Sequence, residues 1–365
     1  MNGHSRLERL RHWLATNDLN IDGLLVTDEI HVRYLTGFTG DSSYLLVTGN
    51  DAVLLSDRRY ETQLAQQCPD LNTLVRGPER KMIDIVGEAI AGLSLASVGL
   101  EAASVTWGFF LSLQKALPSV TFTTAGDPVG ALRMIKDDGE LAILKRAIWI
   151  AERAFESIKA KLRPSQTELQ IAHELEAAMR ELGGEGCGFA AIVGAGAGGA
   201  LPHYRPGDIA IGGSQTLLID WGAKYCGYTS DLTRTLHMDH PPAGFRDAYE
   251  AVLEAHTVAI ATIRDGVKAK DVDAAARQVL HDAGLGDRFK HGLGHGIGLQ
   301  IHEAPRMGAT SEDVLASGMV ITVEPGVYFE HQFGIRIEDD VRVTATGCEL
   351  LSSLPRDYNS CRFAM

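Results

Sequence analysis

The first part of the chain alternates between strand-like and helix-like patterns of apolar residues. Continuous apolar runs at 23–27, 44–48 and 52–56 are typical of short buried strands. Segments 7–14, 58–68 and 80–93 instead place their apolar residues on one face of a helix. This alternation predicts an α/β domain over about the first 125 residues.

Further along the chain, long helical patterns come first and strand patterns follow. Helices are predicted at 136–163, 165–184, 244–265 and 269–284, with strands and turns from residue 187 onward. Ser165 and Glu168 form an S-x-x-E pattern, which predicts a capping box at the start of the second of these helices. We therefore expect two domains, at 1–128 and 129–360, the second of the α+β class.

Two acidic residues, Asp220 and Asp231, lie within apolar strand-like stretches between Leu217 and Thr235. Burial of an unpaired carboxylate costs several kcal/mol, so buried acids normally have a partner. Neither stretch has a Lys or Arg at an obvious pairing position. Antiparallel pairing of the two stretches can bring Asp220 alongside Asp231.

Two further acids occur in strand-like segments nearer the C-terminus. Glu324 ends the apolar stretch before a Pro-Gly turn, and in 334–343 strand alternation puts Arg336, Glu338 and Asp340 on one face. Taken singly, each acid could be a solvated charge on a strand surface. Four strand-borne acids, together with a nearby histidine cluster, favour a functional site instead.

The histidine cluster lies in the glycine-rich segment 291–306. His291 and His295 stand four residues apart, as a metal-binding pair on a helix would. However, the four intervening and flanking glycines each cost roughly 1 kcal/mol in a helix, so an irregular or extended segment is predicted. A lone histidine is usually structural, but His291, His295 and His302 within twelve positions favour a site.

A second glycine-rich motif, GAGAGG at 194–199, matches the dinucleotide-binding fingerprint. That fingerprint requires a helix at its end, and Pro202 and Pro206 prevent one from following here. We therefore expect a flexible loop rather than a nucleotide site.

The composition narrows the class of protein. The formal net charge of −13 and pI of about 5.4 argue against a general binder of nucleic acid or anionic membranes. The five scattered cysteines contain no C-x-x-C, which fits a reducing cytoplasm better than a disulfide framework. No uncharged apolar run approaches the roughly 20 residues of a membrane span.

Charge counting connects the four acids. Asp220, Asp231, Glu324 and Glu338 carry −4 when ionised, which two divalent cations would balance. Oxygen ligands with one imidazole suit a pair of metal ions that share carboxylates. The sequence therefore predicts a dinuclear metal site.

The motifs IDWGAKYCGYTSDLTRT, GHGIG, ITVEPGVY and GIRIEDDV resemble, in order and spacing, those of the pita-bread metallopeptidases. The N-terminal VRYLTGFTGDSSYLLVT and LLSDRRY are similar to the creatinase-type N-terminal domain. The resemblance implies an α+β chain: a C-terminal pita-bread (creatinase/aminopeptidase) fold preceded by a smaller α/β creatinase-type domain. It also implies a likeness to aminopeptidase P and prolidase in particular.

The resemblance also implies roles for individual residues. The metal ligands would be Asp220, Asp231, His295, Glu324 and Glu338. Of these, Asp231 and Glu338 would bridge both ions, and Glu324 would also shuttle a proton to the leaving nitrogen. His203 and His302 would steady the substrate carbonyl, and His291, Arg306 and Arg336 would contact the substrate. For each arginine a supporting salt bridge is the alternative role.

From this resemblance we expect a cytoplasmic, homodimeric metallo-exopeptidase that cleaves the Xaa-Pro bond at the N-terminus of peptides, in the manner of aminopeptidase P. Its cofactors would be two divalent ions, Mn²⁺ first, with Co²⁺, Zn²⁺ or Fe²⁺ as alternatives. The alternative functions are an Xaa-Pro dipeptidase (prolidase), a metal-free creatinase-like C–N hydrolase, and a binding protein without catalysis. Where the family commonly has DFG this chain has Trp221, which we expect to crowd the mouth of the site.

Overall fold

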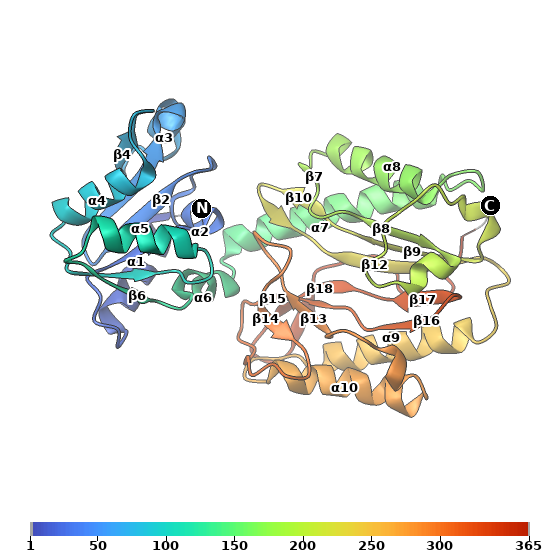
Figure 1. The fold of residues 1–365 in the computed structure, drawn as a ribbon. Coiled ribbons are helices and arrows are strands. Elements are labelled where there is room, and N and C mark those ends of the chain that lie inside the picture. Colours follow the sequence, from blue (N-terminus) through green and yellow to red (C-terminus); the bar gives the residue numbers. More distant parts are fainter. Residues whose placement is uncertain (1–2, 364–365) are drawn as a thin grey trace. The chain divides into compact units, whose positions relative to one another are not determined.

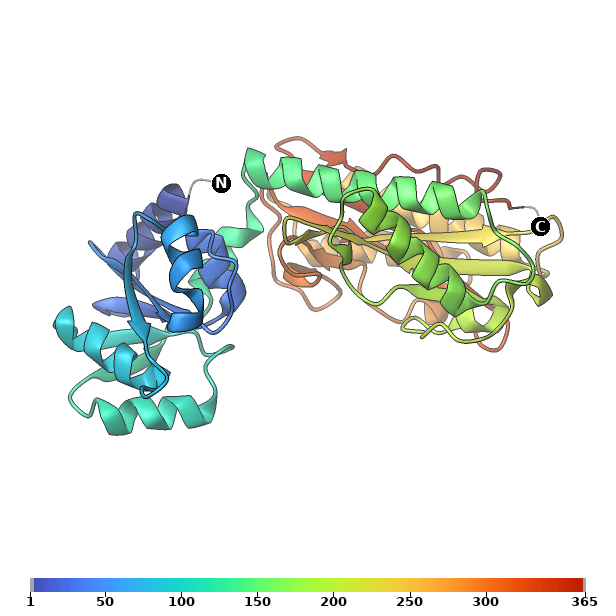
Figure 2. The same cartoon turned by 90° about the horizontal axis from the view of Figure 1, so that it is seen from above.

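The computed structural model describes residues 3–363, which form two compact units. The chain passes from the first unit to the second between Arg133 and Met134. Figures 1 and 2 show the ribbon from two directions. Each unit has its own core of buried apolar side chains, and each is described separately below.

Unit 1 is built on a mixed six-stranded sheet in the order β4-β3-β2-β1-β5-β6. Its strands are β1 (Gly23–Val26), β2 (Tyr44–Thr48), β3 (Ala52–Asp57), β4 (Asn72–Arg76), β5 (Ser97–Leu100) and β6 (Thr121–Thr124). The central pairs β1–β2 and β2–β3 are antiparallel, whereas β3–β4, β1–β5 and β5–β6 are parallel. The three apolar runs predicted as strands are confirmed.

The helices of unit 1 include the three predicted ones. They are α1 (Gly3–Thr16), α2 (Glu29–Thr36), η1 (Arg58–Tyr60), α3 (Glu61–Gln67), α4 (Met82–Gly92), α5 (Trp107–Ala116) and α6 (Pro128–Met134). Buried residues of α4 and α5 share one core cluster with Leu25, Leu46 and Leu55 of the sheet. Because strand side chains alternate, the neighbouring leucines of β1, β2 and β3 are buried on the opposite face.

Four long helices frame unit 2: α7 (Asp138–Lys159), α8 (Glu168–Glu181), α9 (Phe245–Thr262) and α10 (Ala269–Asp282). The predicted capping box of α8 is wrong by two residues. Thr167 is the N-cap, with its hydroxyl accepting from Gln170 N at 3.2 Å and Gln170 Oε1 accepting from Thr167 N at 3.0 Å. Glu168 is instead buried and accepts hydrogen bonds from Ala195 N and Tyr204 OH.

The strands of unit 2 lie between α7 and α8 on one side and α9 and α10 on the other (Figure 1). They are β7 (Gly186–Cys187), β8 (Ile192–Ala195), β9 (Thr216–Trp221), β10 (Ala223–Tyr225), β11 (Tyr228–Thr229), β12 (Leu232–His237), β13 (Gly294–Gly296), β14 (Glu303–Met307), β15 (Val320–Val323), β16 (Gly326–Phe329), β17 (Phe333–Arg336), β18 (Asp339–Val343) and β19 (Cys348–Leu350). They form sheets in the orders β12-β9-β8, β11-β10-β7, β14-β13-β15-β18-β19 and β16-β17. Short 3₁₀ turns η2 (Gly196–Ala200), η3 (Ile211–Gly213) and η4 (Gly286–Arg288) complete the unit.

The segment 334–343, predicted as one strand, is two strands separated at Ile337 and Glu338. The backbone changes partners there: β17 pairs with β16, Glu338 N donates to Thr233 O at 3.1 Å, and β18 pairs with β15. A single bridge between Thr233 and Glu338 thus joins two sheets. Glu338 lies at this junction.

The glycines of GAGAGG allow close backbone packing, and the prediction of a flexible loop there is wrong. The motif ends β8 and forms η2. A Cβ on Gly194 would lie 2.7 Å from Gly199 N, and one on Gly334 of β17 would lie 1.9 Å from Gly199 O. The motif is therefore a tight contact between η2, β8 and β17.

No helix within residues 3–363 combines the length and apolar character needed to cross a membrane.

Candidate metal centre

The five predicted ligands lie on strands that converge in unit 2. Antiparallel pairing of β9 with β12 sets Asp220 opposite Thr233, and Asp231 immediately precedes β12. His295 is the central residue of β13, Glu324 follows β15 directly, and Glu338 precedes β18. All five side chains line one cavity of about 710 Å³. The expectation that β9 and β12 bring the two acids together is confirmed.

Three of the five ligands meet closely. Asp231, His295 and Glu338 each offer a ligand atom within 4.8 Å of the others. His295 Nε2 lies 3.6 Å from Asp231 Oδ2 and 3.6 Å from Glu324 Oε1. Thr233 orients Glu338, because its hydroxyl donates to Glu338 Oε2 at 2.6 Å.

The environment of His295 keeps its imidazole neutral. Burial, followed by the positive charges of His302 and Arg306, lowers its pKa to about 4. Its Nδ1 lies 3.1 Å from Gly296 O, a contact that places the ring proton on Nδ1. The lone pair on Nε2 is then directed at the acids, as a metal ligand requires.

The acids repel one another as the residues stand. Burial foremost, and then the charges of neighbouring carboxylates, raise the pKa values of Asp231 and Glu338 well above the usual range. Asp220 Oδ1 and Asp231 Oδ1 are buried without a hydrogen-bond partner. Buried oxygens of this kind, beside a neutral imidazole, fit divalent cations. The residues present therefore match a metal centre.

Arg336 provides one counter-charge from within the protein. Its guanidinium is 3% exposed and donates to Asp220 Oδ2 at 2.5 Å, to Tyr328 OH at 2.7 Å and to Thr233 Oγ1 at 3.1 Å. These contacts fit the supporting salt bridge better than contact with a substrate. They also supply the partner of Asp220 that the local sequence lacks.

His291 lines the same cavity, but both of its ring nitrogens already have partners. Nδ1 lies 2.8 Å from Gly292 O, and Nε2 lies 2.8 Å from the hydroxyl of Tyr328. Because Tyr328 also accepts from Arg336, a chain of hydrogen bonds connects Asp220 to His291. The contacts favour a role for His291 in holding Tyr328 and Arg336.

The other predicted pocket residues are exposed and lie on the cavity wall. His203, His302 and Arg306 all line the cavity. The ring of His302 stands edge-on to that of His295, with centroids 4.4 Å apart. Burial, followed by repulsion from Arg306, lowers the pKa of His302. These three side chains can reach a substrate without breaking an existing ion pair in the described part of the chain.

Trp221 points away from the cavity, so the expectation that it crowds the mouth is wrong. Its ring is fully buried, stacks on Phe155 with centroids 4.3 Å apart, and donates from Nε1 to Ala151 O at 2.9 Å. Strand alternation explains this orientation, because the neighbour of Asp220 on β9 must face the opposite side.

Several residues that line the cavity were not predicted from the sequence. Leu169, His173 and Glu176 of α8 line the cavity, as do Phe189 and Arg205. The spacing of the three α8 residues indicates that they share one helix face, but the local sequence does not show which way that face points. Arg205 was easier to predict than the others, because it lies only two residues after His203.

A second group of metal-compatible side chains lies in unit 1: His31, Glu101 and Asp127. His31 Nδ1 lies 2.5 Å from Glu101 Oε1, and Glu101 Oε2 accepts from Thr27 N at 2.8 Å. Hydrogen bonds that tie the start of α2 to the end of β5 thus account for this group without an ion.

Comparison with known proteins agrees with this architecture. The model of metallopeptidase family M24 matches residues 142–345, and that of the creatinase/prolidase N-terminal domain matches residues 6–135. An Xaa-Pro dipeptidase of Pyrococcus horikoshii is 33% identical over 352 residues, 96% of this chain and 98% of that protein.

Two solved structures are similar throughout. The Xaa-Pro dipeptidase from Bacillus anthracis has a TM-score of 0.92 at 35% identity, covering 98% of this chain and 99% of that one. The X-Pro aminopeptidase from Thermotoga maritima has a TM-score of 0.88 at 35% identity, with the same coverage.

The fold and the convergent acids define a two-domain metallopeptidase, in which a pita-bread catalytic domain follows a creatinase-type domain in the sequence. The chain belongs to metallopeptidase family M24. The expected fold class and the expectation of a metallo-exopeptidase are confirmed. Metallopeptidases of this family use pairs of divalent metal ions.

Proposed function

We propose that this protein is an Xaa-Pro dipeptidase, with Asp220, Asp231, His295, Glu324 and Glu338 holding two divalent cations. Asp231 and Glu338 would be shared by both ions. The convergence of these side chains and the partnerless buried oxygens of Asp220 and Asp231 support this assignment. When bound, two cations polarise a carbonyl group and lower the pKa of a water molecule, which makes amide hydrolysis possible near neutral pH.

Glu324 is the proposed proton carrier. Burial foremost raises the pKa of its carboxyl to about 8, with Asp220 adding to the increase and Arg336 opposing it. Its side chain is 17% exposed and lines the cavity, with Oε1 3.6 Å from His295 Nε2. One Oε atom of this carboxylate would accept a proton from water and deliver it to the proline nitrogen as the Xaa-Pro bond breaks.

His203 and His302 would hold the substrate carbonyl. Both line the cavity and are exposed. Donors at this place stabilise negative charge that develops on the carbonyl oxygen. The bond they act on is a tertiary amide, whose nitrogen carries no hydrogen, so a pocket shaped for the pyrrolidine ring can select it.

The preference for dipeptides replaces the aminopeptidase activity that the sequence led us to expect first. The observation that carries it is Arg306, an exposed arginine on the cavity wall for which no ion pair is found within residues 3–363. A free guanidinium there suits the terminal carboxylate of a dipeptide, because arginine binds carboxylates through paired hydrogen bonds. The named dipeptidases among the similar proteins agree with this choice.

The test compares substrates that differ only at the carboxyl end. Ala-Pro, Ala-Pro amide and Ala-Pro-Ala are assayed at equal concentration with Mn²⁺, and again after exhaustive chelation. We expect Ala-Pro to be cleaved at least tenfold faster than the amide, a difference of about 1.4 kcal/mol. All activity should disappear when the metal is removed. Arg306→Met should raise KM for Ala-Pro and leave the amide unaffected.

Different outcomes identify the competing functions. Equal or faster cleavage of Ala-Pro-Ala would indicate the aminopeptidase, which the similar X-Pro aminopeptidase structure keeps as the second candidate. Activity that survives full metal removal would contradict the dinuclear mechanism and favour a creatinase-like hydrolase. Two tightly bound ions without any peptidase activity would indicate a binding protein.

The proposal also includes Mn²⁺ as the resident metal, with Co²⁺, Zn²⁺ or Fe²⁺ as alternatives, in a cytoplasmic homodimer. Affinity alone favours zinc over manganese at most sites, so the test is the metal content of protein purified from its own cell without added metal.

A further inference from the structure

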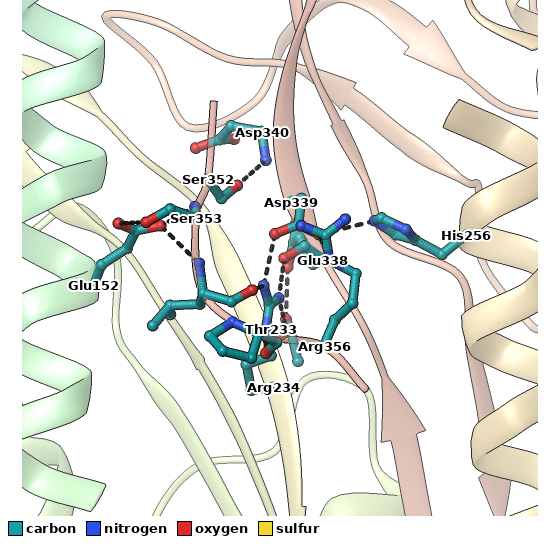
Figure 3. A network of polar contacts seen from close by, with 12 residues as sticks. Glu152, Thr233, Arg234, His256, Glu338, Asp339, Asp340, Ser352, Ser353 and Arg356 are labelled. Atoms are coloured by element: carbon teal, nitrogen blue, oxygen red, sulfur yellow. Dashed lines mark hydrogen bonds and ion pairs between the residues drawn. The ribbon is translucent and has the colours of Figure 1, made fainter. Parts of the chain in front are cut away.

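The backbone beneath the two proposed bridging acids is held by one buried arginine. Arg234 lies on β12, three residues after Asp231, and its side chain is fully buried. Because strand side chains alternate, Arg234 faces away from the side that Asp231 and Thr233 occupy. Arg234 is not among the residues that line the cavity, and Figure 3 shows it beside Thr233 and Glu338.

The Arg234 guanidinium binds all the chain segments that meet there. Nη1 donates to Thr233 O at 2.9 Å and to Glu338 O at 2.7 Å. Nη2 donates to Asp339 Oδ1 at 2.7 Å and to Leu354 O at 2.9 Å, and Nε donates to Pro355 O at 3.0 Å. One side chain thus connects the strand after Asp231, the segment that carries Glu338, and the C-terminal segment 354–355.

Further contacts fix Asp339, the acidic partner of this arginine. His256 Nε2 of α9 lies 3.1 Å from Asp339 Oδ2, and Arg356 Nε lies 3.3 Å from the same atom. Figure 3 shows these side chains gathered around Asp339. The residue next to Glu338 is therefore anchored to a helix as well as to β12.

Two hydrogen bonds donated by backbone N–H groups complete the connection between the proposed bridging acids. Glu338 N donates to Thr233 O at 3.1 Å, and Asp231 N donates to Asp340 Oδ2 at 3.1 Å. Hydrogen bonds therefore hold segment 231–234 to segment 338–340 near Asp231 and again near Thr233. The guanidinium of Arg234 adds its own bonds to both segments. These ties hold together the two segments that carry the acids.

We propose that Arg234 is a positioning residue that sets the separation of Asp231 and Glu338 before the metal ions bind. The inference rests on the proposed function, since it takes these two acids as the bridging ligands. Arg234 touches neither substrate nor metal and acts only through the backbone of the ligands. A preformed ligand pair binds metal more tightly, because less conformational freedom is lost on binding.

The test measures metal affinity directly. Full-length Arg234→Met and Arg234→Lys proteins are freed of metal by chelation and titrated with Mn²⁺ by calorimetry. We expect the affinity of Arg234→Met to fall roughly 10- to 100-fold, the effect that loss of an outer partner of a metal ligand usually has. Arg234→Lys, which keeps the charge but fewer hydrogen bonds, should fall between it and the wild type.

Activity on Ala-Pro at two Mn²⁺ concentrations separates positioning from catalysis. At saturating Mn²⁺ the kcat of the Arg234 variants should approach that of the wild type, whereas at limiting Mn²⁺ it should fall in line with the lost affinity.

Should the Arg234 variants not fold, Asp339→Asn keeps the test decisive. It retains the carbonyl contacts of Arg234 and should still weaken Mn²⁺ binding severalfold.

Glu152→Gln is the matched control. Glu152 of α7 accepts from Ser353 Oγ at 2.7 Å and from Leu354 N at 3.1 Å, so its loss loosens the same C-terminal segment without touching the ligand strands. We expect it to lower the melting temperature and to leave the Mn²⁺ affinity within threefold of the wild type.

Unchanged Mn²⁺ affinity in the Arg234 and Asp339 variants would overturn the positioning role. So would equal weakening by Glu152→Gln, since the effect would then be a general loss of stability. Neither result would affect the proposed function, which fails instead if the wild-type protein binds Mn²⁺ but leaves Ala-Pro intact. A wild-type protein that binds no divalent ion at all would overturn both.

Discussion

The two acids on β9 and before β12 differ in their partners. One oxygen of each acid is buried without a hydrogen bond, but Asp220 has Arg336 at 2.5 Å from its other oxygen, whereas no Lys or Arg pairs with Asp231 among the described residues. Neighbouring carboxylates, in addition to burial, raise the pKa of Asp231 well above its ordinary range. In the metal-free protein burial and these neighbours therefore favour the protonated form of Asp231, and a bound cation would favour its ionised form.

This difference predicts an unusual result for Asp231→Asn. An amide closely resembles a protonated carboxyl group in shape, so the metal-free variant should unfold at the wild-type temperature or slightly above it. It cannot bridge two cations, so activity should fall by more than the roughly 10- to 100-fold that loss of an outer partner costs. Thermal unfolding with and without Mn²⁺, together with Ala-Pro turnover, measures both effects. Near-wild-type turnover would refute the bridging role.

At the scale of elements, glycines determine how closely η2, β8 and β17 can pack. Gly334 on β17 faces the backbone of Gly199 in η2 so closely that no side chain fits between them. The contact holds β17 against η2, and at the end of β17 the backbone N of Arg336 donates to Thr235 Oγ1 of β12 at 3.0 Å. The glycine motif thus acts on the site through packing.

Gly334→Ala should therefore destabilise the protein strongly. Its Cβ would lie 1.9 Å from Gly199 O, a backbone atom that cannot rotate away. Overpacking of this kind costs typically 1–3 kcal/mol, and the upper end is expected here because backbone must move. Urea unfolding measures the loss. Gly347→Ala is the control, since no atom lies within 4 Å of its added Cβ, and a similar loss in both variants would contradict the packing argument.

At the scale of the whole molecule, the buried acids make stability depend on pH. The pKa of Glu324 rises to about 8, chiefly through burial, and those of Asp231 and Glu338 are raised well above their usual ranges by burial and by neighbouring carboxylates. The folded metal-free protein then binds more protons than the unfolded chain, so its stability falls as the pH increases. Below pH 6.5 the lowered pKa values of His291 and His295 act in the opposite direction.

Between pH 6.5 and 8 the effect of the acids on stability can therefore be measured separately from that of the histidines. Across this range the melting temperature of chelator-treated protein should fall, because the folded protein retains protons on these carboxyls that the unfolded chain has released. Protein loaded with Mn²⁺ should change little, so the gain in melting temperature on adding metal should be largest near pH 8. Scanning fluorimetry of both forms at each pH is the measurement. Parallel curves for the two forms would show that these acids do not hold metal.

Much of this protein could be predicted from short-range pattern. Period-two alternation and apolar runs located the strands of unit 1 and the pairing that sets Asp220 beside β12, since strand geometry alone fixes which side chains share a face. The same rule, applied to Trp221, would have predicted that its ring points away from the site. The capping residue of α8 was missed because Glu168 binds the loop at 195–207 rather than its own helix end.

By itself, the sequence determined which residue types carry chemistry and which of them sit on strands, because composition and periodicity are local properties. The tertiary structure decided the partners of the buried charges. Arg336 reaches Asp220 from 116 positions away, and Arg234 joins segments more than 100 positions apart. Such pairings depend on how two sheets meet at Thr233 and Glu338. No local pattern encodes that meeting, because it results from the packing of the whole unit around its core.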